Sequence, residues 1–254
     1  MLKISEHYIK KLIEEGLRID ARTFDQFRNI DIQAGVIKPA EGSARVMLGN
    51  THVLAGVKLS VGEPYPDSPD EGVLVVNAEL VPVASPTFEP GPPNEDAIEL
   101  ARVVDRGIRE SHTIDLEKLA INEKKVWIVN IDVHVLDHDG NLIDASALAA
   151  IAALLDTKIP KYENEKIIYE EKIEKLPISQ KPIAITIGKI AGKLLIDMNL
   201  EEEEALDARV TITTMEDTNI CSIQKGGKGY FTIKELEEAA DLSIRIGKEL
   251  RKLL

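Results

Sequence analysis

The sequence predicts an α+β fold built from two similar halves, and three features support this prediction. Segments with alternating apolar residues recur along the chain, one almost wholly apolar helical segment lies among them, and each half passes from strands to a helix. The chain of 254 residues, of which 44% are hydrophobic, can bury a substantial core. The two halves share too little sequence to be called a repeat.

The first expected element is a short amphipathic helix. Ser5 can cap it, Ile9 and Ile13 lie on its apolar face, and Gly16 can end it. Charged residues interrupt this segment every few positions, so it lacks the apolar core of a signal peptide.

Antiparallel strands are expected next, with Gly49 and Asn50 at a tight hairpin turn. The segment 85–95 is dense in proline and glycine and is expected to be a loop. Asn94 can cap the helix that follows, which should run to about Ser111. The expected strands lie within residues 30–37, 44–59 and 72–84.

A long strand over residues 125–137 has the alternation of a central strand, and residues 142–155 are apolar on all sides of a helix. A helix of that kind is expected to be buried against a sheet. The charged segment 162–177 is expected to link the two halves. Strands are expected at residues 183–190, 193–200, 208–215 and 219–225, followed by a closing helix over 232–254.

Charge and composition limit the classes of function. The net charge of −13 argues against a surface that is basic all over, so nucleic acid would have to meet a local positive patch. No segment is apolar over a membrane-spanning length, which predicts a cytoplasmic protein with no membrane partner. Cys221 is the single cysteine, so an internal disulfide is excluded and a buried thiol in a reducing compartment is expected.

Two patterns resemble metal sites but do not satisfy the geometry. His134 and His138 have a helical ligand spacing, yet they lie on a predicted strand, which separates them by about 13 Å. Residues 137–141 resemble the start of a calcium loop but lack the later oxygen ligands. We therefore expect a strand-to-helix turn at 137–141 and neither a metal nor a cofactor.

The helix after the proline-rich loop carries a basic stripe. Arg102, Arg106 and Arg109 share one face, while apolar residues cover another. One interpretation is a solvated face with ion pairs, for example from Arg102 to Asp105 or Glu99. The other is a track for the phosphates of a nucleic acid.

Carboxylates are concentrated at residues 201–204, and Arg209 follows closely. A solvated loop and a carboxylate metal site both remain open from the residues alone.

Three segments together resemble the RNase PH family, whose members are phosphorolytic 3′→5′ exoribonucleases. The first is "RIDARTFDQFRNIDIQAGVIKPAEGSARVMLGNTHVLAGV", the second is "IELARVVDRGIRES" and the third is "NIDVHVLDHDGNLIDASALAAIAALL". The resemblance covers nearly the whole chain. It implies a two-layer α/β architecture of the RNase PH-like, ribosomal protein S5 domain 2-like type. It also divides the chain into an N-terminal helical extension over 1–17, a first half over 18–160 and a second half over 161–254.

The chain departs from the catalytic members at the positions that carry chemistry. Catalytic members hold the attacking phosphate with a Gly-Ser/Thr-Arg motif, and the matching residues are Asn141, Leu142 and Ile143. Those members also place two aspartates six residues apart, where this chain has Glu203 and Arg209. The resemblance therefore implies a degenerate active site with no catalytic residues.

In this family an archaeal exosome ring alternates a catalytic and a non-catalytic subunit, and the departures resemble the latter. The implied partners are a catalytic RNase PH-like subunit in a hexameric ring, cap subunits that bind RNA, and single-stranded RNA. Because an arginine of the corresponding helix in catalytic relatives meets RNA, Arg102, Arg106 and Arg109 become candidate RNA-binding residues. Two alternatives remain: an active phosphorolytic or metal-dependent nuclease using Glu203 and Asp207, and a structural ring subunit without RNA contact.

Overall fold

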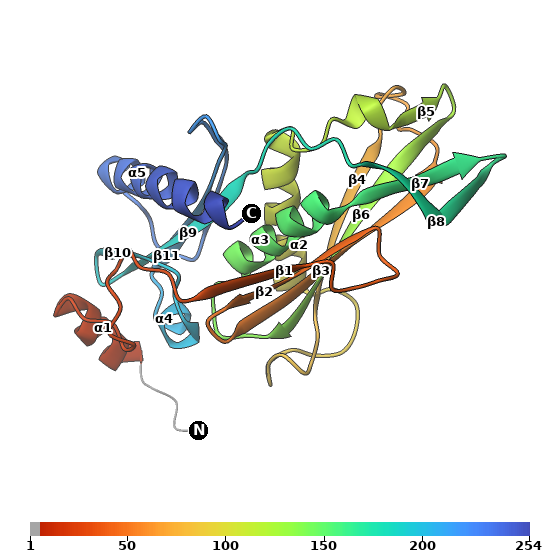
Figure 1. Cartoon of the computed structure of the whole chain (residues 1–254). Helices are drawn as coiled ribbons and strands as arrows, with labels where there is room; N and C mark the ends of the chain where they lie inside the picture. Colours follow the sequence, from red (N-terminus) through yellow and green to blue (C-terminus); the bar gives the residue numbers. More distant parts are fainter. Residues whose placement is uncertain (1–5) are drawn as a thin grey trace.

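The structure is a computed structural model that describes residues 6–254, and Figure 1 shows its two main β-sheets with α3 between them. The predicted cap Ser5 lies outside the described residues. Within these residues, no helix is long and apolar enough to cross a membrane. The helices are α1 (Glu6–Glu14), α2 (Glu95–Glu110), α3 (Leu142–Asp156), α4 (Leu200–Glu204) and α5 (Ile233–Leu250).

The first sheet has the strand order β1-β2-β3-β6-β4, and β5 extends it by pairing with β6. The predicted central strand is correct: β6 pairs antiparallel with β3 and parallel with β4. The hairpin turn at Gly49 and Asn50 joins β2 to β3 as expected. The strands are β1 (Ile30–Ala34), β2 (Gly42–Leu48), β3 (Thr51–Gly62), β4 (Val73–Leu80), β5 (Ala120–Asn122) and β6 (Lys125–Asp137).

The second sheet is antiparallel throughout, with the order β10-β9-β11-β12, and α5 packs on β9 and β11. The charged segment predicted as a link instead forms most of a separate hairpin, β7–β8, because Asn164 and Glu165 adopt the positive φ angles of a tight turn. The strands are β7 (Lys158–Glu163), β8 (Lys166–Lys175), β9 (Ile183–Ile190), β10 (Lys193–Ile196), β11 (Ala208–Thr214) and β12 (Ile220–Gly226).

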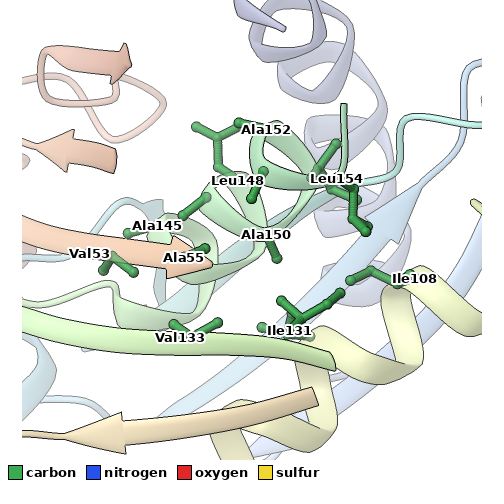
Figure 2. Close-up of a cluster of buried hydrophobic side chains, with 14 of the residues drawn as sticks. Val53, Ala55, Ile108, Ile131, Val133, Ala145, Leu148, Ala150, Ala152 and Leu154 are labelled. Carbon is green, nitrogen blue, oxygen red and sulfur yellow. The ribbon is translucent and has the colours of Figure 1, made fainter. Parts of the chain in front are cut away.

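Helix α3 is the buried element that joins the two halves. It packs against β2 and β3 of the first sheet, against β9 of the second, and against α2. Figure 2 shows alanine and leucine side chains of α3 meeting Val53, Ile131 and Ile108 in one apolar cluster. Each side of α3 faces other protein elements, which explains why its sequence is apolar on every side.

A smaller apolar cluster attaches the N-terminal helix to the second half. Ile9 and Ile13 of α1 pack with Ile190, Leu195 and Met198. The predicted strand at 193–200 is too long, since β10 ends at Ile196 and Asp197 has a φ of +46°. The carboxylate run, for which a solvated loop was one of the two open interpretations, forms the helix α4, which begins after the capping residue Asn199.

Candidate functional site

The passage from β6 to α3 forms the base of the site. Gly140 has a φ of +82°, and a Cβ atom there would lie 2.5 Å from the Met198 carbonyl oxygen, so only glycine fits this close approach. Asn141 follows in the left-handed region with a φ of +55°, and α3 begins at Leu142. The expected turn at 137–141 is therefore present, and it places the start of α3 against the loop that follows β10.

The start of α3 is occupied by a carboxylate of the same chain. The Asn141 backbone N–H donates to Glu203 Oε1 at 2.8 Å. The Asn141 side-chain amide donates to Asp144 at 3.0 Å and to Asp197 at 2.9 Å. The N-terminus of a helix favours an anion, and here the Glu203 carboxyl group of α4 occupies that position.

A cavity of about 300 Å³ opens beside this helix start. It brings together the five residues that the resemblance implied to be degenerate active-site positions, although they come from the start of α3, from α4 and from β11. Apolar side chains from β4, the proline-rich loop and α2 complete the walls. The lining residues include Leu80, Phe88, Asp96, Glu99, Leu100, His138, Asn141, Leu142, Ile143, Glu203, Glu204 and Arg209.

Arg209 does not offer a free positive charge to this cavity. Its guanidinium donates to Glu99 of α2 at 2.5 Å, an ion pair that ties β11 to α2. On β12, a Cβ atom at Gly226 would lie 2.6 Å from Arg209 Nε, so the glycine leaves the space in which the arginine lies. The side chain at this position therefore serves a contact within the chain.

Burial controls the ionisation of the carboxyl groups around Asn141. It raises the pKa of Glu203 to about 7, against the opposing effects of the Asn141 N–H and Arg209. Burial likewise raises the pKa of Asp144 to about 7, although Thr186 donates two hydrogen bonds to it. For Asp197, burial acts in the same direction but hydrogen bonds from Arg28 outweigh it, and the pKa is lowered.

Three arginines from the segment before β1 hold the loop that follows β10. Arg28 donates to both carboxylate oxygens of Asp197, at 2.8 and 3.0 Å. Arg22 donates to Asp197 at 2.8 Å. Arg18 makes a two-pronged contact with Glu202, and both side chains are fully buried.

These arginines lie in the first of the three segments that resemble the family, but the sequence pattern predicted no role for them. Buried arginines with paired acidic partners are costly to desolvate, so their geometry has to be held by further hydrogen bonds. The carbonyl oxygens of Ile196 and Asp197 supply these for Arg18. The sequence contains one signal for this role, because acidic residues within a run rich in apolar neighbours need cationic partners. The arginines that serve as these partners lie far away in the sequence.

The three arginines of the basic stripe lie on the exposed face of α2, but they are not equivalent. Arg109 is bound to Asp105 through two hydrogen bonds and also donates to the Leu74 carbonyl. Arg102 and Arg106 are exposed and make no ion pair within residues 6–254. The suggested pairing of Arg102 with Asp105 or Glu99 is wrong, because Arg109 and Arg209 take those two carboxylates.

The histidines behave as the strand geometry requires. His134 lies within β6 and meets Glu79, whereas His138 follows the strand and stacks on Phe88 with ring centroids 5.3 Å apart. No group of three or more potential metal ligands is found among the residues that the structure describes. Cys221 is half-buried, and burial raises the pKa of its thiol to about 11.

The chain has two linked α+β halves, and the start of α3 meets the acidic helix α4 at one cavity. This architecture defines the class as the two-domain fold of the 3′ exoribonucleases. The chain belongs to the 3′ exoribonuclease (RNase PH) family: the family's domain 1 matches residues 26–160 and its domain 2 matches residues 181–246. This confirms the resemblance found in the sequence and the fold class that it implied.

Relatives in archaea match over the full length. The exosome complex component Rrp42 of Thermococcus gammatolerans is 54% identical, covering 100% of this chain and 95% of the relative. The protein of the same name from Methanopyrus kandleri is 52% identical, covering 99% and 96%.

Solved structures give the same result. A chain of the Archaeoglobus fulgidus exosome with RNA bound to the active site superposes with a TM-score of 0.92 at 50% identity, covering 97% of this chain and 96% of that one. A rice Rrp46 structure, at 19% identity and a TM-score of 0.70, shares the fold.

Proposed function

We propose that this chain is a non-catalytic subunit of an archaeal exosome ring, in which it structures the active site of a catalytic RNase PH-like partner and helps to hold RNA. The ring would degrade RNA phosphorolytically from the 3′ end. The archaeal relatives described above are named as exosome components, and they match along their whole length.

The Glu203 contact with the start of α3 carries the non-catalytic part of this proposal. A phosphate ion at that helix start would meet a carboxylate already hydrogen-bonded to the Asn141 N–H. The adjoining side chains of Leu142 and Ile143 have no hydrogen-bond donors. Arg209, the cationic side chain that lines the cavity among residues 6–254, is paired with Glu99. The Glu203 carboxyl group therefore takes the place of the attacking phosphate, and its ionised form repels that phosphate, which removes the nucleophile for phosphorolysis.

Arg102 and Arg106 support a role in holding RNA. Their guanidinium groups are exposed, and no carboxylate in the described part of the chain neutralises them. Contacts of this kind with phosphates do not depend on base sequence, which suits a complex that degrades different RNAs. Arg109 contributes less, since Asp105 already holds it.

The remaining partners follow from the ring. Cap subunits with RNA-binding domains would deliver RNA to it, and we place the assembly in the cytoplasm. The two alternatives, an active nuclease and a purely structural subunit, are outcomes of the experiments below.

The direct experiment measures nucleoside diphosphate released from single-stranded RNA in the presence of phosphate and Mg²⁺. The chain alone is expected to release none, and a ring reconstituted with the catalytic subunit is expected to be active. Turnover by the chain alone, in a preparation free of other nucleases, would show that the non-catalytic assignment is wrong.

A further inference from the structure

The segment that joins β12 to α5 is basic, although the chain as a whole is acidic. Residues 218–234 contain three lysines and no acidic residue, whereas the net charge of the chain is −13. Lys225, Lys228 and Lys234 are exposed, and none of them makes an ion pair within residues 6–254. We refer to residues 225–234 as the lysine loop. An acidic protein that meets nucleic acid needs a local positive patch of this kind.

Two acidic side chains beside the lysine loop are already paired. Glu235, in the first turn of α5, binds Lys189 of β9 at 2.6 Å. The carbonyl oxygen of Asp207 accepts the Gly229 N–H at 2.8 Å. The carboxylate of the same residue binds Lys10 of α1 at 3.0 Å. Neither carboxylate therefore compensates the charge of the loop lysines.

Close packing fixes the backbone of the lysine loop. A Cβ atom at Gly229 would lie 2.7 Å from the Asp207 carbonyl oxygen. A Cβ atom at Gly226 would lie 2.6 Å from Arg209 Nε, and Gly227 has a φ of +76°. Glycine suits all three positions, since it has no Cβ atom and adopts positive φ without strain. The loop is thus organised before a ligand binds, which reduces the entropy lost on binding.

Tyr230 exposes an aromatic ring at the centre of the lysine loop. The residue is 76% exposed, and Lys189 Nζ lies 5.1 Å from the ring centroid. The same ammonium group donates to the Tyr230 carbonyl oxygen at 3.2 Å. Lys189 therefore supports the ring from within the protein, and most of the ring surface remains available to a planar partner.

These features together match single-stranded nucleic acid. Proteins that bind single strands without sequence preference combine cations that meet the phosphates with aromatic rings on which bases stack. The lysine loop offers both within ten residues, on a fixed backbone. An acidic peptide would satisfy the lysines but would leave the Tyr230 ring without a planar partner.

The lysine loop and the basic stripe of α2 are different surfaces. Arg209, which pairs with α2, lies opposite Gly188 of β9 in the second sheet. Because side chains alternate along a strand, Lys189 points to the other face, where α5 packs. Tyr230 lies beside Lys189, so a contact with RNA there would be additional to the contacts of the stripe.

We propose that the lysine loop is a second contact site for single-stranded RNA on this chain, in which Tyr230 stacks on a base and Lys228 and Lys234 meet neighbouring phosphates. The inference rests on the proposed function, because RNA is the ligand in both. It adds a site that reads stacking as well as charge.

The experiment measures RNA binding by a ring reconstituted with the catalytic subunit, using fluorescence anisotropy with a single-stranded oligonucleotide and no phosphate. Tyr230→Ala should weaken binding by about fivefold or more, since stacking of a base on an aromatic ring contributes roughly 1–3 kcal/mol. Tyr230→Phe should bind as the wild type does, because it keeps the ring.

Salt dependence tests the lysines. Lys228→Ala with Lys234→Ala should reduce the slope of log affinity against log salt by about 1.4, since each phosphate contact with a single strand contributes about 0.7. Lys248→Ala is the matched control and should leave the slope unchanged. Lys248 is an exposed lysine near the other end of α5, and it makes no ion pair among the described residues.

Photocrosslinking gives a test that needs no variant. RNA that contains 4-thiouridine is crosslinked to the wild-type ring, and the adducts are mapped by mass spectrometry. We expect adducts within residues 225–234. Adducts that lie only elsewhere on the ring would overturn the inference.

The inference is also overturned if Tyr230→Ala and the double lysine variant bind RNA as the wild type does. If Tyr230→Ala instead prevents ring assembly, the loop is a subunit contact and the inference is wrong. Weakened binding in Arg102→Ala with Arg106→Ala, together with wild-type binding in the loop variants, would reject this site while leaving the proposed function intact.

Discussion

At the start of α3, the Glu203 carboxylate accepts the hydrogen bond that an anion-binding helix would give to its ligand. In the proposed function the consequence is local: one side chain occupies a position suited to phosphate and, when it is ionised, repels that anion. Asn141 completes the change, because its side chain joins Asp144 to Asp197 and leaves no donor directed at the cavity. In the proposed function, residue identity and not a change of fold separates this site from a catalytic one.

The raised pKa values predict how stability depends on pH. Glu203 and Asp144 bind protons more tightly in the folded chain, each with a pKa of about 7, than in the unfolded chain. Their protonation therefore stabilises the fold at pH 5, and this contribution is lost as the pH rises through 7. The lowered pKa of Asp197 affects the stability of the fold only in more acidic solution.

Thermal unfolding between pH 5 and pH 8 measures this effect. Glu203→Gln should reduce the fall in Tm across that interval, whereas Glu201→Gln should leave it as in the wild type. An equal pH dependence in wild type and Glu203→Gln would contradict the assigned ionisation.

Among the elements, α2 links the cavity to the exposed surface. Its inner face packs on β4 and α3, Glu99 binds Arg209 at the cavity, and its outer face presents Arg102 and Arg106. The helix can thus contact RNA on one side while its other side belongs to the core. Arg109 is less available for RNA, because its guanidinium donates a hydrogen bond to Asp105.

The two free arginines predict a change in salt dependence. In an assembled ring, Arg106→Glu should weaken RNA binding to a similar degree for different sequences, because phosphate contacts carry no base information. Removing one arginine that meets a phosphate of single-stranded RNA should reduce the slope of log affinity against log salt by about 0.7, so Arg102→Ala with Arg106→Ala should reduce it by about 1.4.

Arg245→Glu is a suitable control, because Arg245 is an exposed arginine of α5 that pairs with Asp25. Rings with wild-type affinity and salt slope despite both α2 substitutions would favour the purely structural alternative.

Over the whole molecule, the spacing of apolar residues predicted most helices and strands, because the faces that carry these residues are buried in the structure. It predicted β6, α2 and α3, and the all-apolar character of α3 indicated burial against a sheet, whereas the structure places α3 against both sheets. The carboxylate run was ambiguous for a physical reason. Glu202 needs Arg18, which lies 184 residues away, and a pairing across that distance leaves no local pattern.

The position of α3 between the halves predicts a large effect of a core substitution. Leu154→Ala removes a side chain that is almost fully buried in the shared core and should lower the free energy of unfolding by roughly 2–5 kcal/mol. Leu253→Ala, which changes a half-exposed leucine in the same way, should cost far less. Denaturant unfolding of the isolated chain measures both, and equal losses would contradict the assigned core.

The central claim is that this chain contributes no phosphorolytic site of its own to the ring. The most direct measurement uses a reconstituted ring in which the catalytic partner has been inactivated by substitution while this chain remains wild type. Release of nucleoside diphosphate from RNA with phosphate is then followed. The account predicts RNA binding without any release. Sustained phosphorolysis by that ring would contradict it, because the Glu203 cavity would then have to bind phosphate after all.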